Sequence, residues 1–369
     1  MVSKACIVGM YQRKLEELAS LPGIELVVAV PPYWREGASV LPLERMYTSG
    51  YELLTLPMVF NGSFHIHFYR GLEALVRRFK PEILHIDEEP YNLATFQAMH
   101  LARKHRARAL FFTWQNLQRH YPFPFSAVER YNLTHAQYAI AGNREAEDVL
   151  RAKGYLGPIK VLPQFGVDPQ LFQGQGLRSR PEGEFIIGYM GRLVEEKGVQ
   201  VLLRAVSGLD GAWRVRLIGS GPFAESLRTL SVTLGIQERV DFISRVPSAE
   251  AASALRGLDT LVLPSLTRRN WKEQFGRVLI EAMACEVPVV GSCSGEIPNL
   301  IADAGLVVQE GDETALGAAL RQLMQDVALR TQLGRKGRAR VLSNYTQQHV
   351  AAVTHDVYRQ MLASAQFGS

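Results

Sequence analysis

Short runs of apolar and β-branched residues alternate with longer amphipathic stretches along this chain of 369 residues. Apolar runs bounded by turn residues predict buried strands, and the stretches between them predict helices that cover a parallel sheet. The pattern occurs twice, on either side of a passage rich in turn residues. The predicted strands span residues 5–9, 24–30, 51–56, 83–86, 109–113, 138–141 and 159–162, and then 185–190, 213–218, 240–243, 260–263, 288–290 and 306–308.

The turn-rich passage predicts a boundary between two domains, because it contains Gly174, Gly176 and Pro181. A chain of this length also exceeds what one compact core usually holds. We therefore expect two doubly wound, Rossmann-like α/β domains at residues 1–168 and 185–345, with a linker at 169–184. Residues 346–369 are expected to hold a helix whose apolar face consists of Val350, Val353, Val357, Met361 and Leu362.

Glu273 and Glu281 stand before and within a further predicted helix. At a rise of ~1.5 Å per residue, roughly 12 Å separates them along the helix axis, which is about the reach of a sugar diphosphate from hexose to ribose. The helix start between them offers unpaired backbone N–H groups and the positive end of the helix dipole to an anion. The spacing predicts one ligand that is held at both ends.

Arg192 and Lys197 lie in the loop between the strand at 185–190 and the helix predicted at 199–206. Two cations at this position can neutralise a diphosphate in the cleft expected between the domains. Surface cations beside such a loop are common. The prediction that these two residues bind a diphosphate therefore depends on the carboxylate pair downstream.

The run from Glu273 to Glu281 resembles the signature of the retaining glycosyltransferases of family 4, which have the GT-B architecture. The resemblance covers residues 185–345. It rests on Phe275-Gly276, Glu281-Ala282-Met283-Ala284, Pro288-Val289-Val290, Gly191-Arg192-Leu193, Lys197-Gly198, Gly219-Ser220-Gly221-Pro222, Pro264-Ser265 and Ser294-Gly295-Glu296-Ile297-Pro298. It implies two Rossmann-like domains that face each other across a cleft, with the C-terminal helix crossing back to the N-terminal domain.

The resemblance implies a retaining, metal-independent hexosyltransferase that transfers a sugar from a nucleoside-diphosphate sugar to an unidentified glycan, lipid or small molecule. Residues 1–168 would bind the acceptor and residues 185–345 the donor. Glu273 would contact the donor sugar, while Arg192 and Lys197 would stabilise the charge that grows on the leaving diphosphate. We therefore predict these three as the catalytic residues. The predicted nucleotide-sugar contacts are Gly191, Gly219, Arg245, Gln274, Phe275, Gly276 and Glu281, the last at the ribose.

The N-terminal half matches this family less closely. Gly9-Met10-Tyr11-Gln12 replaces the expected glycine-rich loop, and Trp114-Gln115-Asn116 stands where relatives carry Thr-x-His. Because an amide does not titrate near neutrality, Gln115 is expected to hydrogen-bond the sugar and not to act as an acid or base. The residues predicted on the acceptor or sugar side are Tyr11, Glu88, Gln115 and Asn116.

Two further predictions concern helix ends. Asp87 follows the strand at 83–86 and is predicted to cap the helix expected around 92–103. Glu286 replaces the customary glycine after the helix that holds Glu281. A left-handed backbone at Glu286 would cost about 1 kcal/mol.

Charge and composition limit the partners. Residues 1–180 hold 21 Lys and Arg against 16 Asp and Glu, whereas the remainder holds 20 of each. The basic clusters around residues 77–80 and 103–108 indicate either an anionic acceptor or membrane surface, or merely the solvated ends of two helices.

No apolar run is long enough to span a bilayer, and no signal peptide is evident. We expect a cytoplasmic protein, with a peripheral place at the inner membrane face left open, and no nucleic-acid partner. The oligomeric state stays undetermined.

Metal and cofactor sites are not expected. The sequence has no Asp-x-Asp pair, its three cysteines lack CxxC spacing, and His65 and His67 have no third ligand placed nearby. Gly219 and Gly221 also fit a dinucleotide fingerprint, but Asp241 opens its strand where that fingerprint needs an acid at the strand's end. The donor is thus expected as a substrate, with no cofactor. The alternative is a non-catalytic nucleotide-sugar-binding protein on the same fold, because fold alone does not establish function.

Overall fold

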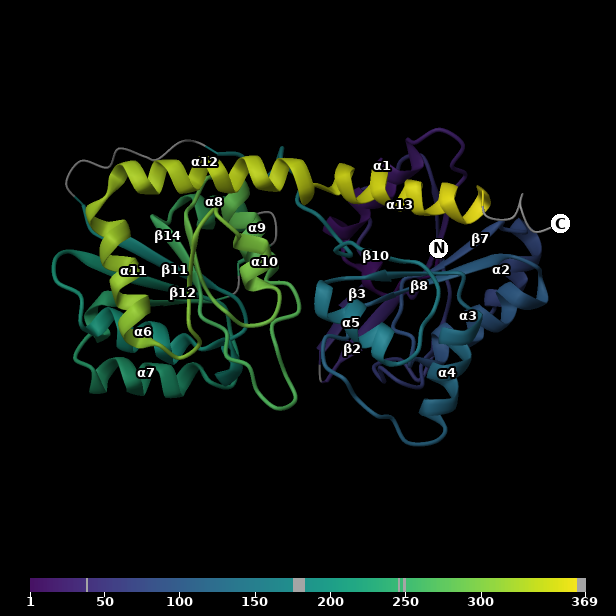
Figure 1. Ribbon diagram of the computed structural model, residues 1–369, viewed down its shortest axis with the longest axis horizontal. Coiled ribbons are helices and arrows are strands. Elements are labelled where there is room, and N and C mark those ends of the chain that lie inside the picture. Colours follow the sequence, from purple (N-terminus) through teal and green to yellow (C-terminus); the bar gives the residue numbers. More distant parts are fainter. Residues whose placement is uncertain (38, 175–182, 245, 248–249, 364–369) are drawn as a thin grey trace. The chain divides into compact units, whose positions relative to one another are not determined.

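A computed structural model describes residues 1–37, 39–174, 183–244, 246–247 and 250–363. The chain divides into two compact units (Figure 1). Unit 1 comprises residues Met1–Gly166 together with Gln347–Ser369, and unit 2 comprises Val167–Thr346. Residues 175–182, which are half of the linker predicted at 169–184, lie outside the described residues.

Unit 1 contains parallel strands flanked by helices. Strands β10, β9, β8 and β7 form one parallel sheet in that order, and β1 pairs in parallel with β4. The strands are β1 (Val27–Val30), β2 (Tyr33–Glu36), β3 (Ser39–Pro42), β4 (Glu52–Thr55), β5 (Met58–Val59), β6 (Phe68–Tyr69), β7 (Ile83–Ile86), β8 (Arg108–Thr113), β9 (Tyr138–Ala141) and β10 (Ile159–Val161). The pairs β2–β3 and β5–β6 are antiparallel hairpins that the strand pattern did not predict.

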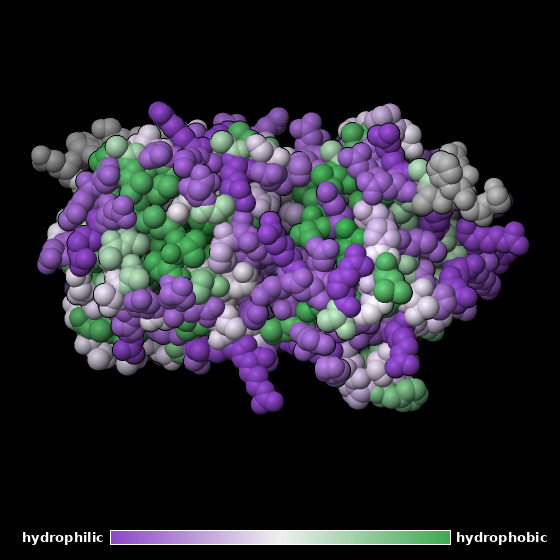
Figure 2. All heavy atoms as spheres, viewed as in Figure 1, coloured by the Kyte–Doolittle hydropathy of each residue, from purple (hydrophilic) through white to green (hydrophobic). Residues whose placement is uncertain are grey.

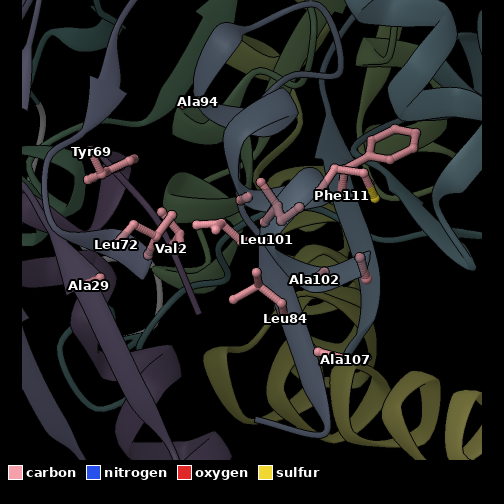
Figure 3. Close-up of a cluster of buried hydrophobic side chains, with 14 of the residues drawn as sticks. Val2, Ala29, Tyr69, Leu72, Leu84, Ala94, Leu101, Ala102, Ala107 and Phe111 are labelled. Carbon is pink, nitrogen blue, oxygen red and sulfur yellow. The ribbon is translucent and has the colours of Figure 1, made fainter. Parts of the chain in front are cut away.

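The helices of unit 1 cover both faces of these strands. They are η1 (Ala5–Ile7), η2 (Gly9–Gln12), α1 (Arg13–Ala19), α2 (Leu72–Phe79), α3 (Leu93–Lys104), α4 (Phe125–His135), α5 (Arg144–Ala152) and α13 (Gln347–Ala363). One core cluster joins α2 and α3 to the strands through Leu72, Leu84, Leu101 and Phe111, and Figure 3 shows these side chains converging. A second cluster joins α1 and α13 to the other face.

Helix α13 packs on α1, as expected for a C-terminal helix that returns to the N-terminal domain. Its apolar face was predicted largely correctly: Val350, Val357 and Met361 are buried and Val353 is partly buried. Leu362 is 38% exposed, so its assignment to the buried face was wrong. The buried face ends at Met361, and the next residue points to a different side because one helical turn takes about 3.6 residues.

The strand predicted at residues 5–9 is wrong. The chain pairs with β1 and β7 only around Val2, which bridges Ala29 and Ile86. The Ser3 hydroxyl then accepts a hydrogen bond from the Cys6 backbone N–H at 3.3 Å, and two short 3₁₀ turns follow. The apolar run is therefore buried as turns and not as a strand. These turns occupy the place where a glycine-rich loop was expected.

Unit 2 is a six-stranded parallel sheet in the order β13-β12-β11-β14-β15-β16. The strands are β11 (Phe185–Met190), β12 (Trp213–Ile218), β13 (Val240–Ile243), β14 (Thr260–Leu263), β15 (Val289–Ser292) and β16 (Leu306–Val308). The central strands β11 and β14 are almost entirely buried. This is why their sequences read as continuous apolar runs: helices cover both faces of a parallel sheet.

The helices of unit 2 connect these strands. They are η3 (Glu195–Lys197), α6 (Val199–Ser207), α7 (Ala224–Thr233), η4 (Gln237–Arg239), α8 (Ala251–Arg256), α9 (Arg277–Ala284), α10 (Ile297–Ile301), α11 (Glu313–Gln325) and α12 (Val327–Asn344). Helix α12 packs on α9. Its Gly334 and Gly337 permit this close approach, because an added Cβ would lie 2.3 Å from the Glu286 carbonyl oxygen and 3.1 Å from Met283, respectively.

Hydrophilic side chains cover most of the surface seen in Figure 2, and hydrophobic residues appear between them in separate patches. Among the described residues, none of the helices combines the length and apolar character that crossing a bilayer would require.

Candidate functional site

Three loops meet at the carboxyl edge of the unit 2 sheet. They follow the neighbouring strands β11, β14 and β15, and they carry residues 191–198, 264–276 and 293–296. Because all strands of a parallel sheet end at the same edge, residues far apart in the sequence come together there. This edge is where open α/β sheets bind ligands.

Lys197 and Glu273 form the centre of this edge. The Lys197 Nζ lies 2.6 Å from Glu273 Oε2, and the Ser265 hydroxyl donates to the same oxygen at 2.8 Å. The Lys197 ammonium also sits over the ring of Trp271, 5.0 Å from its centroid. Glu273 is only 6% exposed. The buried carboxylate is therefore fixed by a cation and a hydroxyl from two different loops.

The backbone of Glu273 is held as tightly as its side chain. Its carbonyl oxygen accepts a hydrogen bond from the Glu296 N–H at 3.2 Å. Gly295 has a φ of +51°, and an added Cβ would stand 1.9 Å from that same oxygen. A glycine is required here by both the conformation and the close approach. The loop after β15 thus fixes the position of Glu273.

Glu281 lies in helix α9, as predicted, and has a different partner. The Arg277 guanidinium, one turn earlier, forms an ion pair with Glu281, with 2.8 Å between Arg277 Nε and Glu281 Oε1. Burial raises the pKa of Glu281, and the charge of Arg277 opposes this effect. Lys197 and Glu273 therefore form one charged group, and Arg277 and Glu281 form another on α9.

Helix α9 begins after Gly276, whose φ is +80°. An added Cβ on Gly276 would lie 2.9 Å from Leu263 at the end of β14, so the helix start is packed directly against the strand. Phe275 is buried, and its ring lies 6.1 Å from that of Tyr345. Gln274, the remaining predicted contact in this run, is exposed.

Gly191 and Gly219 bring two loops into backbone contact. Gly219 has a φ of +149°, and an added Cβ would lie 1.9 Å from the Gly191 carbonyl oxygen. The Leu193 N–H donates to the Ser220 carbonyl at 2.9 Å. These glycines therefore let the loops after β11 and β12 pack against each other. The packing alone requires glycine at position 219, whether or not a nucleotide binds there.

Arg192 lies at the end of β11 and is exposed. Its backbone carbonyl accepts a hydrogen bond from the Tyr189 hydroxyl at 2.7 Å, so the loop is anchored to the strand while the guanidinium is directed outward. Arg245, which was predicted to contact the nucleotide, lies outside the described residues.

The residues predicted on the acceptor side all belong to unit 1. The amide of Gln115 is engaged at both ends, because its Nε2 donates to the Leu117 carbonyl at 3.2 Å and its Oε1 accepts from Lys153 at 3.1 Å. Asn116 donates to Glu145 at 3.3 Å. Gln115 and Asn116 are neighbours at the end of β8, and both are buried.

Tyr11 makes an aromatic contact. It sits in η2, and its ring stacks on Phe165 with 4.0 Å between the centroids. An aromatic contact within unit 1 therefore occupies one face of this ring.

Glu88 lies in a buried polar cluster. It accepts a hydrogen bond from the Tyr69 hydroxyl at 3.0 Å, it pairs with the Lys4 ammonium, and His67 Nε2 lies 3.5 Å from Oε2. Burial alone would raise the pKa of Glu88, but the Lys4 ammonium and the neighbouring His67 ring lower it to about 2. Glu88 is 2% exposed, and its carboxylate oxygens contact groups of unit 1 in this conformation.

The prediction that Asp87 caps a helix is wrong. Helix α3 begins only at Leu93 with Asn92 before it, and Asp87 Oδ2 instead accepts a hydrogen bond from the Ser3 hydroxyl at 2.6 Å. A partner distant in the sequence replaced the local one. Asp87 thereby ties the first residues of the chain to the end of β7.

The backbone at Glu286 is left-handed, with a φ of 61°. The conditional prediction of strain at this position therefore applies, because a side chain stands where a glycine would fit without cost. Arg338 of α12 lies near its carboxylate, with 3.8 Å between Arg338 Nε and Glu286 Oε1.

Sequence reasoning did not single out Ser265 and Trp271 as partners of the charged pair. Ser265 stood in the Pro264-Ser265 motif, which was a usable signal, whereas nothing local marks Trp271. Within the described ranges, no three His, Cys, Asp or Glu side chains gather closely enough to hold a metal ion.

Comparison with known proteins links the second half of the chain to one family. The model of the family described as "Glycosyl transferases group 1" matches residues 178–340. That segment contains Arg192, Lys197, Glu273 and Glu281. The recognition made from the sequence motifs is therefore confirmed.

Two relatives resemble the chain in sequence. A D-inositol 3-phosphate glycosyltransferase from Stackebrandtia nassauensis is 33% identical over 213 residues, which are 52% of this chain and 46% of the relative. A GDP-mannose-dependent α-(1-6)-phosphatidylinositol monomannoside mannosyltransferase from Mycolicibacterium smegmatis is 31% identical over 59% of this chain and 57% of its own length. The matches thus span about half the length of these curated relatives.

Solved structures share the fold over nearly the whole chain. A sucrose-phosphate synthase from Thermosynechococcus elongatus aligns with a TM-score of 0.73 at 22% identity, covering 96% of this chain and 93% of that structure. HepE from Anabaena, in complex with UDP, also aligns with a TM-score of 0.73, at 16% identity over 97% and 98% of the two chains. The GT-B fold predicted from the sequence is confirmed.

Proposed function

We propose that this protein is a retaining, metal-independent glycosyltransferase that transfers a hexosyl group from a nucleoside-diphosphate sugar to an acceptor. The observation that supports this most directly is the fixed pair Lys197 and Glu273 at the carboxyl edge of the unit 2 sheet, where Lys197 shares its loop with Arg192. A preorganised charged group at a ligand-binding edge favours catalysis, because it does not have to reorganise as charge develops.

The roles follow from the chemistry of the donor. When the anomeric C–O bond breaks, negative charge accumulates on the leaving diphosphate, and the cations Arg192 and Lys197 would stabilise it. Glu273, held by Ser265 and Lys197, would accept hydrogen bonds from the donor sugar. Glu281 would receive the ribose hydroxyls, with Arg277 keeping its carboxylate oriented. Together the carboxylates would hold the two ends of the donor.

The nucleotide end of the donor would meet the two packed glycine loops and the start of α9. Gly191 and Gly219 would allow the diphosphate to approach backbone N–H groups, and Gly276 would present the first turn of α9. Gln274, Phe275 and Arg245 complete the proposed nucleotide-sugar contacts. Unit 2 would then bind the donor, and unit 1 would bind the acceptor through Tyr11, Glu88, Gln115 and Asn116.

The proposed acceptor is anionic. Relatives are named for D-inositol 3-phosphate, phosphatidylinositol monomannoside and L-malate, each of which bears a phosphate or a carboxylate. The positive charge of the first half of this chain suits such an acceptor. A lipid-linked acceptor would bring the protein to the inner membrane face, where the basic ends of α2 and α3 would contact anionic headgroups.

A donor screen tests the function. Uridine, guanosine and adenosine diphosphate sugars are incubated with the protein, slow hydrolysis is followed by nucleotide release, and thermal shift measures binding. Hydrolysis of one donor that Glu273→Ala abolishes supports the enzyme. Binding without any turnover, in the presence of an acceptor panel, would instead support a non-catalytic nucleotide-sugar-binding protein. That second candidate is favoured by Gln115, whose amide is already engaged within unit 1.

A further inference from the structure

Unit 1 contains a cavity that the proposed donor site does not use. It has a volume of about 330 Å³ and lies among helix α4, the segment that precedes α4 and the end of α5. At roughly 30 Å³ per water molecule this is room for about ten waters. The volume falls at the lower end of the range of ligand pockets, which is about 300 to 1,000 Å³. The cavity can hold a ligand of monosaccharide size.

The lining carries an excess of positive charge. Arg119, Arg130 and Lys153 line the cavity, and Glu129 is the acid among its lining residues. Lys153 and Glu129 form an ion pair whose side chains are only 10% and 11% exposed, so these two charges neutralise each other. Arg119 and Arg130 are exposed at the cavity, so the lining holds three cations and one acid. An anion that enters meets two guanidinium groups and one compensated acid.

Polar and aromatic groups complete the walls. Ser126 and Thr134 of α4 offer hydroxyls; that of Thr134 donates to the Arg130 carbonyl at 2.8 Å, so its oxygen remains as an acceptor. The ring of Tyr121 packs under the Lys153 ammonium at 5.0 Å, which holds the lysine in place. A lining that combines cations with hydroxyls suits a ligand that carries both an anionic group and hydroxyl groups.

Lys153 connects the cavity to the end of β8. Its Nζ donates both to Glu129 and to the Gln115 side-chain oxygen, the latter at 3.1 Å. Lys153 therefore links the wall of the cavity to the side chain of Gln115, a residue that we place on the acceptor or sugar side.

We propose that this cavity binds a small anionic sugar, with Arg119 and Arg130 on its phosphate or carboxylate and with Ser126 and Thr134 on its hydroxyls. The chemistry fits two sources: the acceptor itself, or an effector that is not consumed. Binding does not depend on the donor, whereas the role as acceptor rests on the proposed function.

Direct binding tests the site. The full chain is titrated by calorimetry with glucose 6-phosphate, glucuronate and glucose. We expect at least one anionic sugar to bind about tenfold or more tightly than glucose, and Arg130→Gln to weaken that binding about tenfold, as loss of a charge-assisted hydrogen bond predicts. Arg119→Gln provides a second variant. Arg359→Gln, on the exposed surface of α13, removes the same charge elsewhere and should leave binding unchanged.

Equal affinity for glucose and both anionic sugars would overturn the proposal. So would wild-type affinity in both Arg130→Gln and Arg119→Gln when their melting curves match that of the wild type. Inorganic phosphate should compete with the anionic sugar, and a failure to compete at high excess would exclude the two arginines as the anion site.

Adding a hydrolysable donor decides whether the bound anionic sugar is the acceptor or an effector. A probe recovered as a glycosylated product is an acceptor, whereas a probe recovered unchanged that alters the donor hydrolysis rate is an effector. A complete lack of turnover with every donor would refute the proposed function and leave the calorimetric result standing. The two failures are thus distinguishable.

Discussion

Lys197 and Glu273 lie 76 positions apart in the sequence, and their side chains meet with 2.6 Å between Nζ and Oε2 at the carboxyl edge of one sheet. The ion pair is largely buried, with the two side chains 20% and 8% exposed. Removal of one partner of such a pair leaves a desolvated charge. It should therefore reduce stability more than removal of one partner of a surface pair. The following predictions use this pair and four other features.

Glu273→Ala should reduce donor turnover by at least about 100-fold, while nucleotide affinity changes by less than about tenfold. The carboxylate is proposed to contact the sugar, whereas the nucleotide is held elsewhere, so the loss should fall on turnover. Arg192→Ala should weaken both, because the diphosphate is present in ground and transition states. Turnover and nucleotide binding are measured on the same preparations. Glu313→Ala, at an exposed carboxylate on α11, is the matched control. Wild-type kinetics in Glu273→Ala would remove this residue from the site.

Gly295→Ala should destabilise unit 2 by about 2 kcal/mol or more. The new Cβ would stand 1.9 Å from the Glu273 carbonyl oxygen, and the φ of +51° disfavours any side chain. The free energy of unfolding is measured by urea titration. Gly208→Ala is a suitable comparison, because the nearest atom to its added Cβ is 4.0 Å away. Equal stability of the two variants would contradict the packing described around Glu273.

Glu286→Gly should stabilise the protein by up to about 1 kcal/mol, because glycine adopts a φ of 61° without steric cost. The carboxylate also lies near Arg338, so Glu286→Ala is the necessary reference. The alanine variant removes the carboxylate but keeps the strained backbone. The free energy of unfolding in urea should therefore be higher for Glu286→Gly than for Glu286→Ala, by the cost of the strained backbone. The reverse order would refute the strain.

Glu88 should make stability depend on pH in the acid range. Its folded-state pKa is lowered from 4.5 to about 2, so its contribution is present above pH 4.5 and is lost as the pH falls toward 2. The linkage amounts to about 3 kcal/mol. We expect Glu88→Gln to lose stability at pH 7 and to differ much less from the wild type near pH 2. Parallel pH profiles of unfolding free energy for the two proteins would contradict the lowered pKa.

Membrane association through the basic helix ends predicts sedimentation with anionic liposomes at low salt. Arg77 and Arg78 lie in the last turn of α2 and are exposed. Their neighbours are partly neutralised, because Lys104 pairs with Glu73 at 2.7 Å. The double variant Arg77→Gln and Arg78→Gln should weaken binding to phosphatidylserine vesicles by about 2 kcal/mol, at about 1 kcal/mol per charge. Protein that stays in the supernatant at low ionic strength would show that these are solvated helix ends.

The alternation of apolar and amphipathic stretches was sufficient to predict most strands of both units. Residues 83–86, 185–190 and 213–218 are strands with the predicted bounds. Residues 83–86 and 185–190 are almost entirely buried, so each of these strands stands out in the sequence as a largely apolar run. In 213–218 the buried residues alternate at first with Arg214 and Arg216, which are partly exposed. The hairpins β2–β3 and β5–β6 were missed, because partly exposed short strands such as Tyr33–Glu36 carry no continuous apolar run.

The errors have a common physical cause. The run at 5–9 was apolar enough for a strand, but Ser3 turned the chain by its bonds to Cys6 and Asp87. The same bond to Ser3 took Asp87 away from the helix it was expected to cap. For Asp87 a partner distant in the sequence outcompeted a local preference, whereas at residues 5–9 the turn also uses the local bond from the Cys6 N–H to the Ser3 hydroxyl.

The sequence by itself determined the family, the two α/β units and the positions of Glu273 and Glu281 around the start of α9, because strand burial, helix period and motif spacing are local properties. Only the tertiary structure decided which charges meet. It paired Glu273 with Lys197 and Ser265, paired Glu281 with Arg277, and tied Gln115 to Lys153 beside a basic cavity. These contacts depend on which strands lie side by side, since a parallel sheet brings together the ends of strands that the chain visits far apart.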